Sequence, residues 1–370
     1  MIIGVPKEIK NHEYRVGLTP SNVKSYVNNH HTVLIQKDAG KGANFTNEQY
    51  EAAGAKIIET AKEIFAQADM IIKVKEPLPE EYDLLKENTI LFTYLHLAAN
   101  QGLLDVLLKK NILGVAYETI EDSKGFLPAL RPMSEIAGRL SIQEGAKYIE
   151  STYGGKGILL GGVPGVERGK VTIIGGGVAG TYAAKVALGM GANVTILDKN
   201  MNRLEYLNDI FGNAITTLYS NDSNIEKCCR NADLIVGCVL LPGSKAPKII
   251  TEEHVKNMKK GSVIVDIAID QGGCCETSHV TTHDDPIYIK HGVVHYCVGN
   301  MPGSVPFTST IALTNVTESY GLLIANQGIK KAIEIDPGLR NGVNTYLGKV
   351  TNKNLAISLG YEYQDLKNLL

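Results

Sequence analysis

The stretch that decides the fold runs from Val171 to Asp198 and reads VTIIGGGVAGTYAAKVALGMGANVTILD. An apolar run leads into Gly175, Gly177 and Gly180, which have the spacing G-x-G-x-x-G, and a helix-like segment follows. A second apolar run ends at Asp198, 18 residues after Gly180. The dinucleotide-binding fingerprint requires this order of a strand, a glycine turn, a helix and a second strand that ends in an acidic residue.

The glycines predict a backbone that turns sharply and closely approaches a pyrophosphate, at a helix N-terminus whose amides and dipole favour anions. Asp198 can accept hydrogen bonds from a ribose 2′-hydroxyl and would repel a 2′-phosphate, which favours NAD over NADP. The basic residues Lys199 and Arg203 nearby weaken that preference. A solvated strand-end carboxylate is the alternative interpretation of Asp198.

Apolar runs alternate with polar, helix-like stretches on both sides of this motif. The first set of candidate strands covers residues 1–6, 31–36, 55–60, 69–77, 89–96 and 113–120. The second set covers residues 170–176, 192–198, 214–220, 233–239, 262–270 and 293–299. The pattern predicts an α/β protein with two doubly wound, Rossmann-like domains, each with a parallel sheet, and a cleft between the domains.

The length of 370 residues also suggests two domains rather than one. Residues 131–151 have helical spacing and predict a connecting helix with Ser134 as its N-cap. Residues 309–334 predict a long helix, after which too few residues remain for a third domain. The expected division is a substrate domain of residues 1–133 and 305–370 and an NAD-binding domain of residues 134–304.

Composition narrows the class of partner. A formal net charge of -2 gives no basic footprint for nucleic acid, and 21% charged residues is an ordinary value for a globular protein. No apolar run reaches the roughly 18 residues that a membrane span requires. We therefore expect a soluble, intracellular protein that binds small molecules.

The six cysteines all lie in the second half of the chain, and none forms a C-x-x-C pair. Residues 274–297 gather cysteines and histidines, so a metal site is conceivable there, but their spacings fit no ligand pattern. We expect no metal, and we expect the cysteines to be small core residues.

Four polar residues lie at the ends of predicted strands, where ligands of open α/β sheets bind. Arg15 follows the first strand, Lys75 and His96 lie at the ends of the fourth and fifth, and Asp270 ends the run SVIVDIAID. The alternatives are a surface charge for Arg15, a snorkelling side chain for Lys75, a buried core histidine for His96 and a turn-former for Asp270. Together they suit an NAD enzyme that acts on a small carboxylate, which needs cations, a proton donor or acceptor and a carboxylate near the reacting carbon.

The chain resembles the alanine dehydrogenase family, which also includes the nucleotide-binding alpha chain of proton-translocating transhydrogenase. The resemblance spans essentially the whole chain. It is carried by PKEIKNHEYRVGLTP, KVKEP, FTYLHLAA, RPMSEIAGRL, IIGGGVAG, VDIAIDQGGCCETS and HYCVGNMPGSVP.

The resemblance implies reversible, NAD-dependent oxidative deamination of L-alanine to pyruvate and ammonium, in a cytoplasmic homohexamer. Arg15 and Lys75 would hold the substrate carboxylate and carbonyl oxygen, and His96 and Asp270 would be the catalytic pair. Besides the three glycines, the implied cofactor contacts are Ser134, Val178, Ala179, Asp198, Arg203, Ser220, Val239, Leu240, Ile267, Ala268, Ile269, Asp270, Val298, Asn300 and Met301.

Two positions depart from the family pattern. Arginine is usual where this chain has His279, and a basic residue is common where it has Phe307. We expect His279 to alter one nucleotide contact and to leave the catalytic set unaffected. Two rival functions remain. A transhydrogenase-like subunit would need a membrane partner and a second dinucleotide, and an NAD-sensing module would leave the four polar residues without a role.

Overall fold

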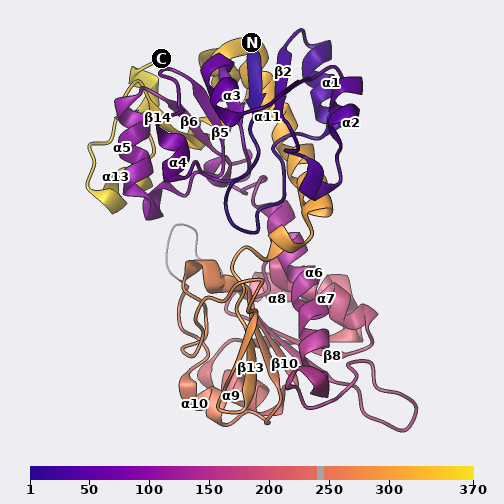
Figure 1. The fold of residues 1–370 in the computed structure, drawn as a ribbon. Coiled ribbons are helices and arrows are strands. Elements are labelled where there is room, and N and C mark those ends of the chain that lie inside the picture. The colour runs from indigo at the N-terminus through magenta and orange to yellow at the C-terminus, as the bar shows by residue number, and fades with distance from the viewer. Residues whose placement is uncertain (240–245) are drawn as a thin grey trace. The chain divides into compact units, whose positions relative to one another are not determined.

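The computed structural model describes residues 1–239 and 246–370. The chain divides into two compact units, Met1–Met133 with Gly303–Leu370 and Ser134–Pro302. Each unit is built on one mixed, mostly parallel sheet with helices packed on it (Figure 1). The predicted α/β class with two such sheets is confirmed, although each sheet, predicted to be parallel, also contains antiparallel strands.

The sheet of the first unit has the strand order β15-β14-β6-β5-β4-β1-β2-β3. Its strands are β1 (Ile2–Val5), β2 (Thr32–Gln36), β3 (Lys56–Ile58), β4 (Met70–Ile72), β5 (Ile90–Thr93), β6 (Leu113–Ala116), β14 (Val343–Tyr346) and β15 (Lys349–Val350). The first six are the predicted strands, and they are parallel to one another. Sequence reasoning missed the antiparallel β14 and β15, whose sequences, VNTY and KV, contain no continuous apolar run.

Both faces of this sheet are covered by helices. In β5, Ile90 and Phe92 pack in one core with Tyr26 of α1, whereas Leu91 packs in the opposite core with Phe65 of α3. Burial on both faces explains the nearly continuous apolar runs of the strands. The helices are α1 (Pro20–Asn28), α2 (Asn47–Ala52), α3 (Ala61–Gln67), α4 (Pro79–Tyr82), α5 (Gln101–Lys109), α11 (Pro306–Ile335), α12 (Leu339–Gly342) and α13 (Lys353–Leu359).

Local sequence sets where several of these helices begin. Thr19, Thr46 and Thr60 cap α1, α2 and α3, and each forms a capping box with the third residue of its helix. The predicted long helix is present as α11, but Gly328 adopts φ 71° and ψ 163° and interrupts its helical geometry.

The sheet of the second unit has the strand order β12-β13-β11-β10-β7-β8-β9. Its strands are β7 (Lys170–Ile174), β8 (Asn193–Asp198), β9 (Ile215–Tyr219), β10 (Leu234–Gly237), β11 (Val263–Asp266), β12 (Ile287–Lys290) and β13 (Val293–Tyr296). All six predicted strands are present. The antiparallel β12 was missed because its hairpin turn, His291-Gly292, is not one of the usual turn pairs, although both residues have the positive φ of such a turn.

Helices also pack on both faces of this second sheet. Ile225 of α9 and Val255 of α10 belong to one core. On α6, an added Cβ at Gly138 would lie 2.1 Å from the Ala179 carbonyl oxygen, so α6 packs closely on the start of α7. The helices are α6 (Arg131–Tyr148), α7 (Val178–Gly189), α8 (Met201–Phe211), α9 (Asp222–Asn231) and α10 (Glu252–Lys256).

The predicted N-cap of the connecting helix is wrong. The helix α6 begins at Arg131, so Ser134 lies inside its first turn. Pro132 explains the earlier start, because its fixed φ and missing N–H are tolerated in the first turn of a helix.

Candidate functional site

The glycine motif forms the turn between β7 and α7. Gly175 has φ 101°, which few residues other than glycine adopt. A Cβ at Gly180 would lie 1.9 Å from the Gly175 carbonyl oxygen, so only glycine allows the helix to pack on the turn. Gly177 is the N-cap of α7, and no atom lies within 4 Å of a Cβ placed there. The turn therefore leaves room for a ligand at a helix N-terminus.

Asp198 and Arg203 both contact this turn. The Asp198 carboxylate accepts hydrogen bonds from the Gly176 N–H at 2.7 Å and the Asn200 N–H at 2.8 Å. Arg203 donates from Nε to the Gly176 carbonyl at 2.5 Å and from Nη2 to the Thr181 hydroxyl at 2.5 Å. The acidic strand end and the basic residue after it therefore hold the glycine turn in shape from two sides.

Most of the other candidate cofactor residues follow the parallel strands of this sheet. Ser220 follows β9 and Val239 follows β10, while Val298, Asn300 and Met301 follow β13. The segment Ile267–Gln271 is the 3₁₀ helix η6, which contains Ile267, Ala268, Ile269 and Asp270. Ser134 instead lies on α6, and Leu240 lies outside the described residues.

The strand before Asp270 is shorter than predicted. It ends at Asp266, whose buried carboxylate accepts hydrogen bonds from the N–H groups of Ala268 at 3.2 Å and Cys274 at 2.9 Å. These bonds start a 3₁₀ turn where the apolar pattern had suggested continued strand. Asp270 is exposed in that turn, and its carboxylate accepts a hydrogen bond from the Asn300 N–H at 3.2 Å.

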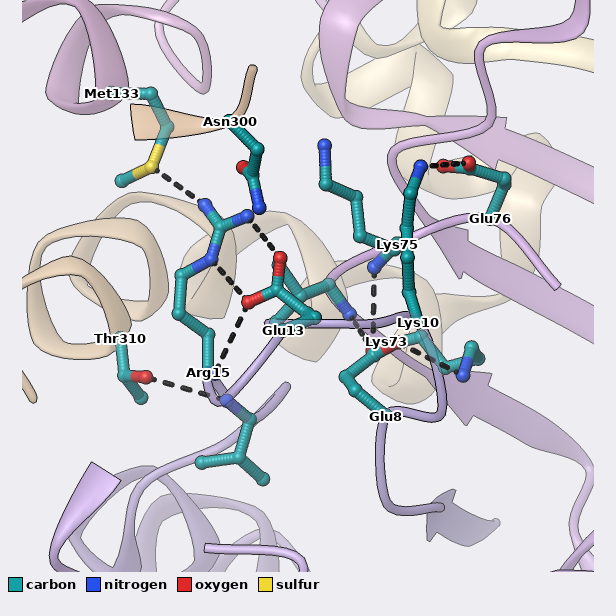
Figure 2. A network of polar contacts seen from close by, with 12 residues as sticks. Glu8, Lys10, Glu13, Arg15, Lys73, Lys75, Glu76, Met133, Asn300 and Thr310 are labelled. Atoms are coloured by element: carbon teal, nitrogen blue, oxygen red, sulfur yellow. Dashed lines mark hydrogen bonds and ion pairs between the residues drawn. The ribbon is translucent and has the colours of Figure 1, made fainter. Parts of the chain in front are cut away.

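Arg15 is buried in the first unit, so its interpretation as a surface charge is wrong: it is 2% exposed. Its Nε and Nη2 atoms donate to the Glu13 carboxylate at 2.7 and 2.5 Å, and its Nη1 atom donates to the Met133 sulfur at 3.0 Å (Figure 2). Burial opposes the charge, but Glu13 outweighs burial and the pKa of Arg15 lies above its usual value.

Lys75 lies three residues after β4 and is half-buried. Within the described residues its ammonium group makes no ion pair or hydrogen bond, and no dashed line reaches it among the residues drawn in Figure 2. Burial, then repulsion from Arg15 and Lys10, lowers the pKa of Lys75. Arg15 and Lys75 are both positive and repel each other, and the Lys75 ammonium group has no ion-pair partner in the part of the chain that the structure describes. The site they form therefore favours an anion.

A fully buried lysine supports the same segment. Lys73 is 0% exposed and lies 3.1 Å from a Glu8 oxygen and 2.9 Å from a Glu81 oxygen. The Glu8 carboxylate also accepts the N–H of Val74 at 2.6 Å and of Lys75 at 3.3 Å. The backbone that carries Lys75 is thus held by a buried cluster of charges.

His96 lies three residues after β5 and is exposed, so the alternative of a buried core histidine is wrong. Its ring stacks on that of Tyr94 with a centroid distance of 5.9 Å and an interplanar angle of 11°. Its backbone has φ 47° and ψ 36°, in the left-handed region. The side chain is therefore presented at the surface of the unit by a tight turn.

The structure brings the three predicted residues of the first unit together. The strands β5, β4 and β1, which precede them, are neighbours in the sheet. Repulsion from Arg15 contributes to the lowered pKa of Lys75. Burial raises the pKa of Glu76, but attraction to Lys10 and then to His96 outweighs burial, so the pKa of Glu76 lies below its usual value. One edge of the sheet therefore carries two cations and an imidazole.

Sequence reasoning missed two carboxylates that support this site, Glu8 and Glu13. The signal was present in PKEIKNHEYR, where acidic residues alternate with basic ones. A buried cation requires a charged or hydrogen-bonding partner, so burial of Arg15 would have pointed to Glu13.

The two residues expected to depart from the family pattern, His279 and Phe307, are both held by ring stacking. The exposed ring of His279 stacks on Tyr288 at 3.7 Å between centroids, and Phe307 stacks on Phe45 at 5.5 Å. In the same region, the buried His295 is hydrogen-bonded to the Thr277 hydroxyl at 2.7 Å, and burial lowers its pKa to about 4. Among residues 1–239 and 246–370, no three His, Cys, Asp or Glu side chains are grouped so as to hold a metal ion.

Comparison with known proteins identifies the family. The model described as "Alanine dehydrogenase/PNT, N-terminal domain" matches residues 4–137, and "Alanine dehydrogenase/PNT, C-terminal domain" matches residues 141–353. This chain belongs to the alanine dehydrogenase/PNT family. The predicted class of NAD-dependent oxidoreductase, with NAD as its cofactor, is thereby confirmed.

Similar proteins in this family match along the whole chain. The alanine dehydrogenase of Methanococcus maripaludis is 60% identical over 96% of this chain and 96% of its own length. That of Bacillus subtilis is 58% identical over 98% of this chain and 96% of its own length. A solved structure of an L-alanine dehydrogenase superimposes with a TM-score of 0.94 at 51% identity, covering 97% of this chain and 99% of that one. Among the described residues, none of the helices combines the length and the apolar content that a membrane crossing would need.

Proposed function

We propose that this protein catalyses the reversible, NAD-dependent oxidative deamination of L-alanine to pyruvate and ammonium. The observation that carries the proposal is the cation pair of Arg15 and Lys75 on the sheet edge that also bears the exposed His96, in a chain of this family. Such a site suits a small substrate with a carboxylate and a heteroatom that exchanges a proton. The relatives named alanine dehydrogenase supply the identity of that substrate.

The second unit would hold the cofactor. Its residues fit NAD, because Gly177 leaves open space at the start of α7 and Asp198 ends the next strand with a carboxylate that suits a ribose hydroxyl. The same carboxylate disfavours a 2′-phosphate, although Arg203 lies close by. When bound, NAD supplies the acceptor for the hydride that leaves the substrate α-carbon.

The first unit would hold the substrate. Arg15 is kept charged and in place by Glu13, and its guanidinium group would bind the substrate carboxylate through the N–H groups that Glu13 does not occupy. The Lys75 ammonium would contact the oxygen that becomes the pyruvate carbonyl and stabilise negative charge on it. An anionic substrate would also relieve the repulsion that lowers the pKa of Lys75.

The proton transfers would belong to His96 and Asp270. Hydride loss leaves an iminium group on the substrate, water adds to it to form a carbinolamine, and collapse of the carbinolamine releases ammonia. Asp270 would orient the attacking water and the amine, and His96 would exchange a proton with the oxygen of the carbinolamine. The exposure of both side chains leaves them accessible to a substrate.

We also propose that the protein works in the cytoplasm as a homohexamer. The resemblance to this family supports the assembly, and six free cysteines suit a reducing compartment. Light scattering behind a sizing column should give a mass near six times the chain mass of 40.0 kDa. A monomer or dimer mass at working concentration would overturn the proposed assembly.

The proposed activity is tested by following NADH absorbance with the purified protein. L-alanine with NAD, and pyruvate with ammonium and NADH, should turn over, whereas NADP, D-alanine and L-serine should be poor replacements. A parallel fluorescence titration with NADH reports cofactor binding independently of turnover. Binding of NADH without turnover of L-alanine would contradict the proposed reaction.

A further inference from the structure

His96 occupies a backbone conformation that needs support. Its φ of 47° and ψ of 36° lie in the left-handed region, where a residue with a Cβ is strained. Such conformations persist when neighbouring groups hold the backbone in place. The turn that presents His96 must therefore have a partner that favours this geometry over an ordinary one.

Glu118 is that partner. One carboxylate oxygen of Glu118 accepts the N–H of His96 at 2.6 Å and the N–H of Leu95 at 3.2 Å. The other oxygen also lies 3.2 Å from the Leu95 nitrogen. Two successive N–H groups can point at one carboxylate only if the backbone turns sharply between them, so these bonds favour the turn at His96.

The sheet explains how the two residues meet. Glu118 belongs to the 3₁₀ helix η3 (Tyr117–Thr119), which follows β6, the parallel neighbour of β5. The register pairs Thr93 with Ala116, and Leu95 and Glu118 each lie two residues beyond that pair. The carboxylate therefore reaches the turn from the adjacent strand end.

The backbone at Lys75 is held by a similar pair of hydrogen bonds to a carboxylate. Glu8, which follows β1, accepts the N–H groups of Val74 and Lys75, which follow the adjacent strand β4. Glu8 also pairs with the buried Lys73, so its removal would disturb a structural ion pair. Glu118 is half-buried and provides the cleaner test of the arrangement.

We propose that Glu118 is a positioning residue for His96, whose carboxylate holds the Leu95–His96 turn so that the imidazole meets the substrate oxygen. This proposal rests on the proposed function and adds to it a residue that acts only through His96. Misplacement of a reacting group by about 1 Å can cost roughly 100-fold in rate, so loss of the turn should appear in kcat.

The test compares Glu118→Ala with Glu118→Gln, and uses Glu121→Ala as a matched control. The amide oxygen of glutamine can still accept the His96 N–H, so Glu118→Gln should stay close to wild type. Glu118→Ala should lower kcat by about 10-fold to 100-fold, with little change in the NADH titration. Glu121 lies three residues along the chain, and its carboxylate accepts a hydrogen bond from the Asn341 side chain instead, so its variant should be unaffected.

A double-mutant cycle separates positioning from a general structural role. In a His96→Ala background, Glu118→Ala should cause no further loss of turnover, because the residue through which it acts is gone. An equal loss in both backgrounds would overturn the proposal. A Glu118→Gln variant that turned over as slowly as His96→Ala would also overturn the proposal. This second comparison remains possible even if Glu118→Ala does not fold.

Crystal structures of the variants give a readout that does not depend on turnover. The φ angle of residue 96 should remain positive in Glu118→Gln and leave the left-handed region in Glu118→Ala. An unchanged φ in Glu118→Ala would overturn the positioning role even in an active enzyme. A wild-type protein that binds NADH but does not oxidise L-alanine would instead contradict the proposed function, and the φ angle would still decide the role of Glu118.

Discussion

The close approach of α7 to the glycine turn can be tested by Gly180→Ala. The added Cβ would lie 1.9 Å from the Gly175 carbonyl oxygen, whereas real Cβ contacts essentially never fall below 3.0 Å. The helix and the turn must therefore separate by at least 1.1 Å, the difference between those two distances. Overpacking of this kind typically costs about 1–3 kcal/mol of folding free energy. It would also move the amides expected to face the pyrophosphate.

Two other glycines of the same segment serve as controls. A Cβ at Gly177 or at Gly189 meets no atom within 4 Å, and neither residue has a positive φ. Gly189→Ala, at the last residue of α7, should therefore preserve both stability and NADH binding. Gly177→Ala should preserve stability but weaken NADH binding, if the open space at the start of α7 is where the pyrophosphate lies.

Thermal unfolding and NADH fluorescence titration, applied to all three variants, make the comparison. We expect Gly180→Ala to lower both the melting temperature and the NADH affinity, the latter by about tenfold or more, since each 1.4 kcal/mol is a factor of ten. A Gly180→Ala protein with wild-type melting temperature and NADH affinity would refute the reasoning. Equal behaviour of Gly177→Ala and Gly189→Ala towards NADH would refute the assignment of the pyrophosphate to this turn.

Three further predictions concern other parts of the chain. His96→Ala should leave a folded, NADH-binding protein whose turnover falls by about 100-fold or more, and near wild-type turnover would return His96 to a structural role. Lys73→Met should lower the unfolding free energy by about 3–5 kcal/mol in denaturant titrations, because it leaves the buried Glu8 and Glu81 without their cation; an unchanged midpoint would contradict this pairing. Burial lowers the pKa of His295 to about 4, so the folded state binds a proton at this residue more weakly than the unfolded state does. The stability that the neutral His295 contributes is therefore present above about pH 6.5 and is lost as the pH falls towards about 4. Compared with wild type, His295→Gln should show a shallower loss of stability over that range, and parallel curves would refute the assignment.

The sequence was sufficient for the parts of the fold that depend on local patterns. The twelve apolar runs became the parallel strands, because burial on both faces of a sheet requires continuous apolar residues. The antiparallel strand β12 was missed because its hairpin turn is not a usual turn pair, and β14 and β15 were missed because they contain no continuous apolar run. Strand ends were also predicted too late, as at Asp266, where side-chain hydrogen bonds begin a turn within an apolar run.

The candidate site was also predicted only in part from the sequence. Arg15, Lys75, His96 and Asp270 could be proposed from their positions at or after the ends of predicted strands, since the ends of parallel strands gather at one edge of a sheet. Their environments could not be predicted in this way. The burial of Arg15 and the exposure of His96 depend on which distant segments pack around them.

The sequence by itself thus determined the two α/β sheets, the glycine turn and the residue types at the strand ends, because each is set by neighbours along the chain. Only the tertiary structure decided which carboxylate meets which cation or turn. Glu118 reaches His96, and Glu8 reaches Lys75, because parallel pairing places the ends of separate strands side by side. Such pairs are far apart in sequence, and the free energy that holds them comes from burial and hydrogen bonding in the folded chain.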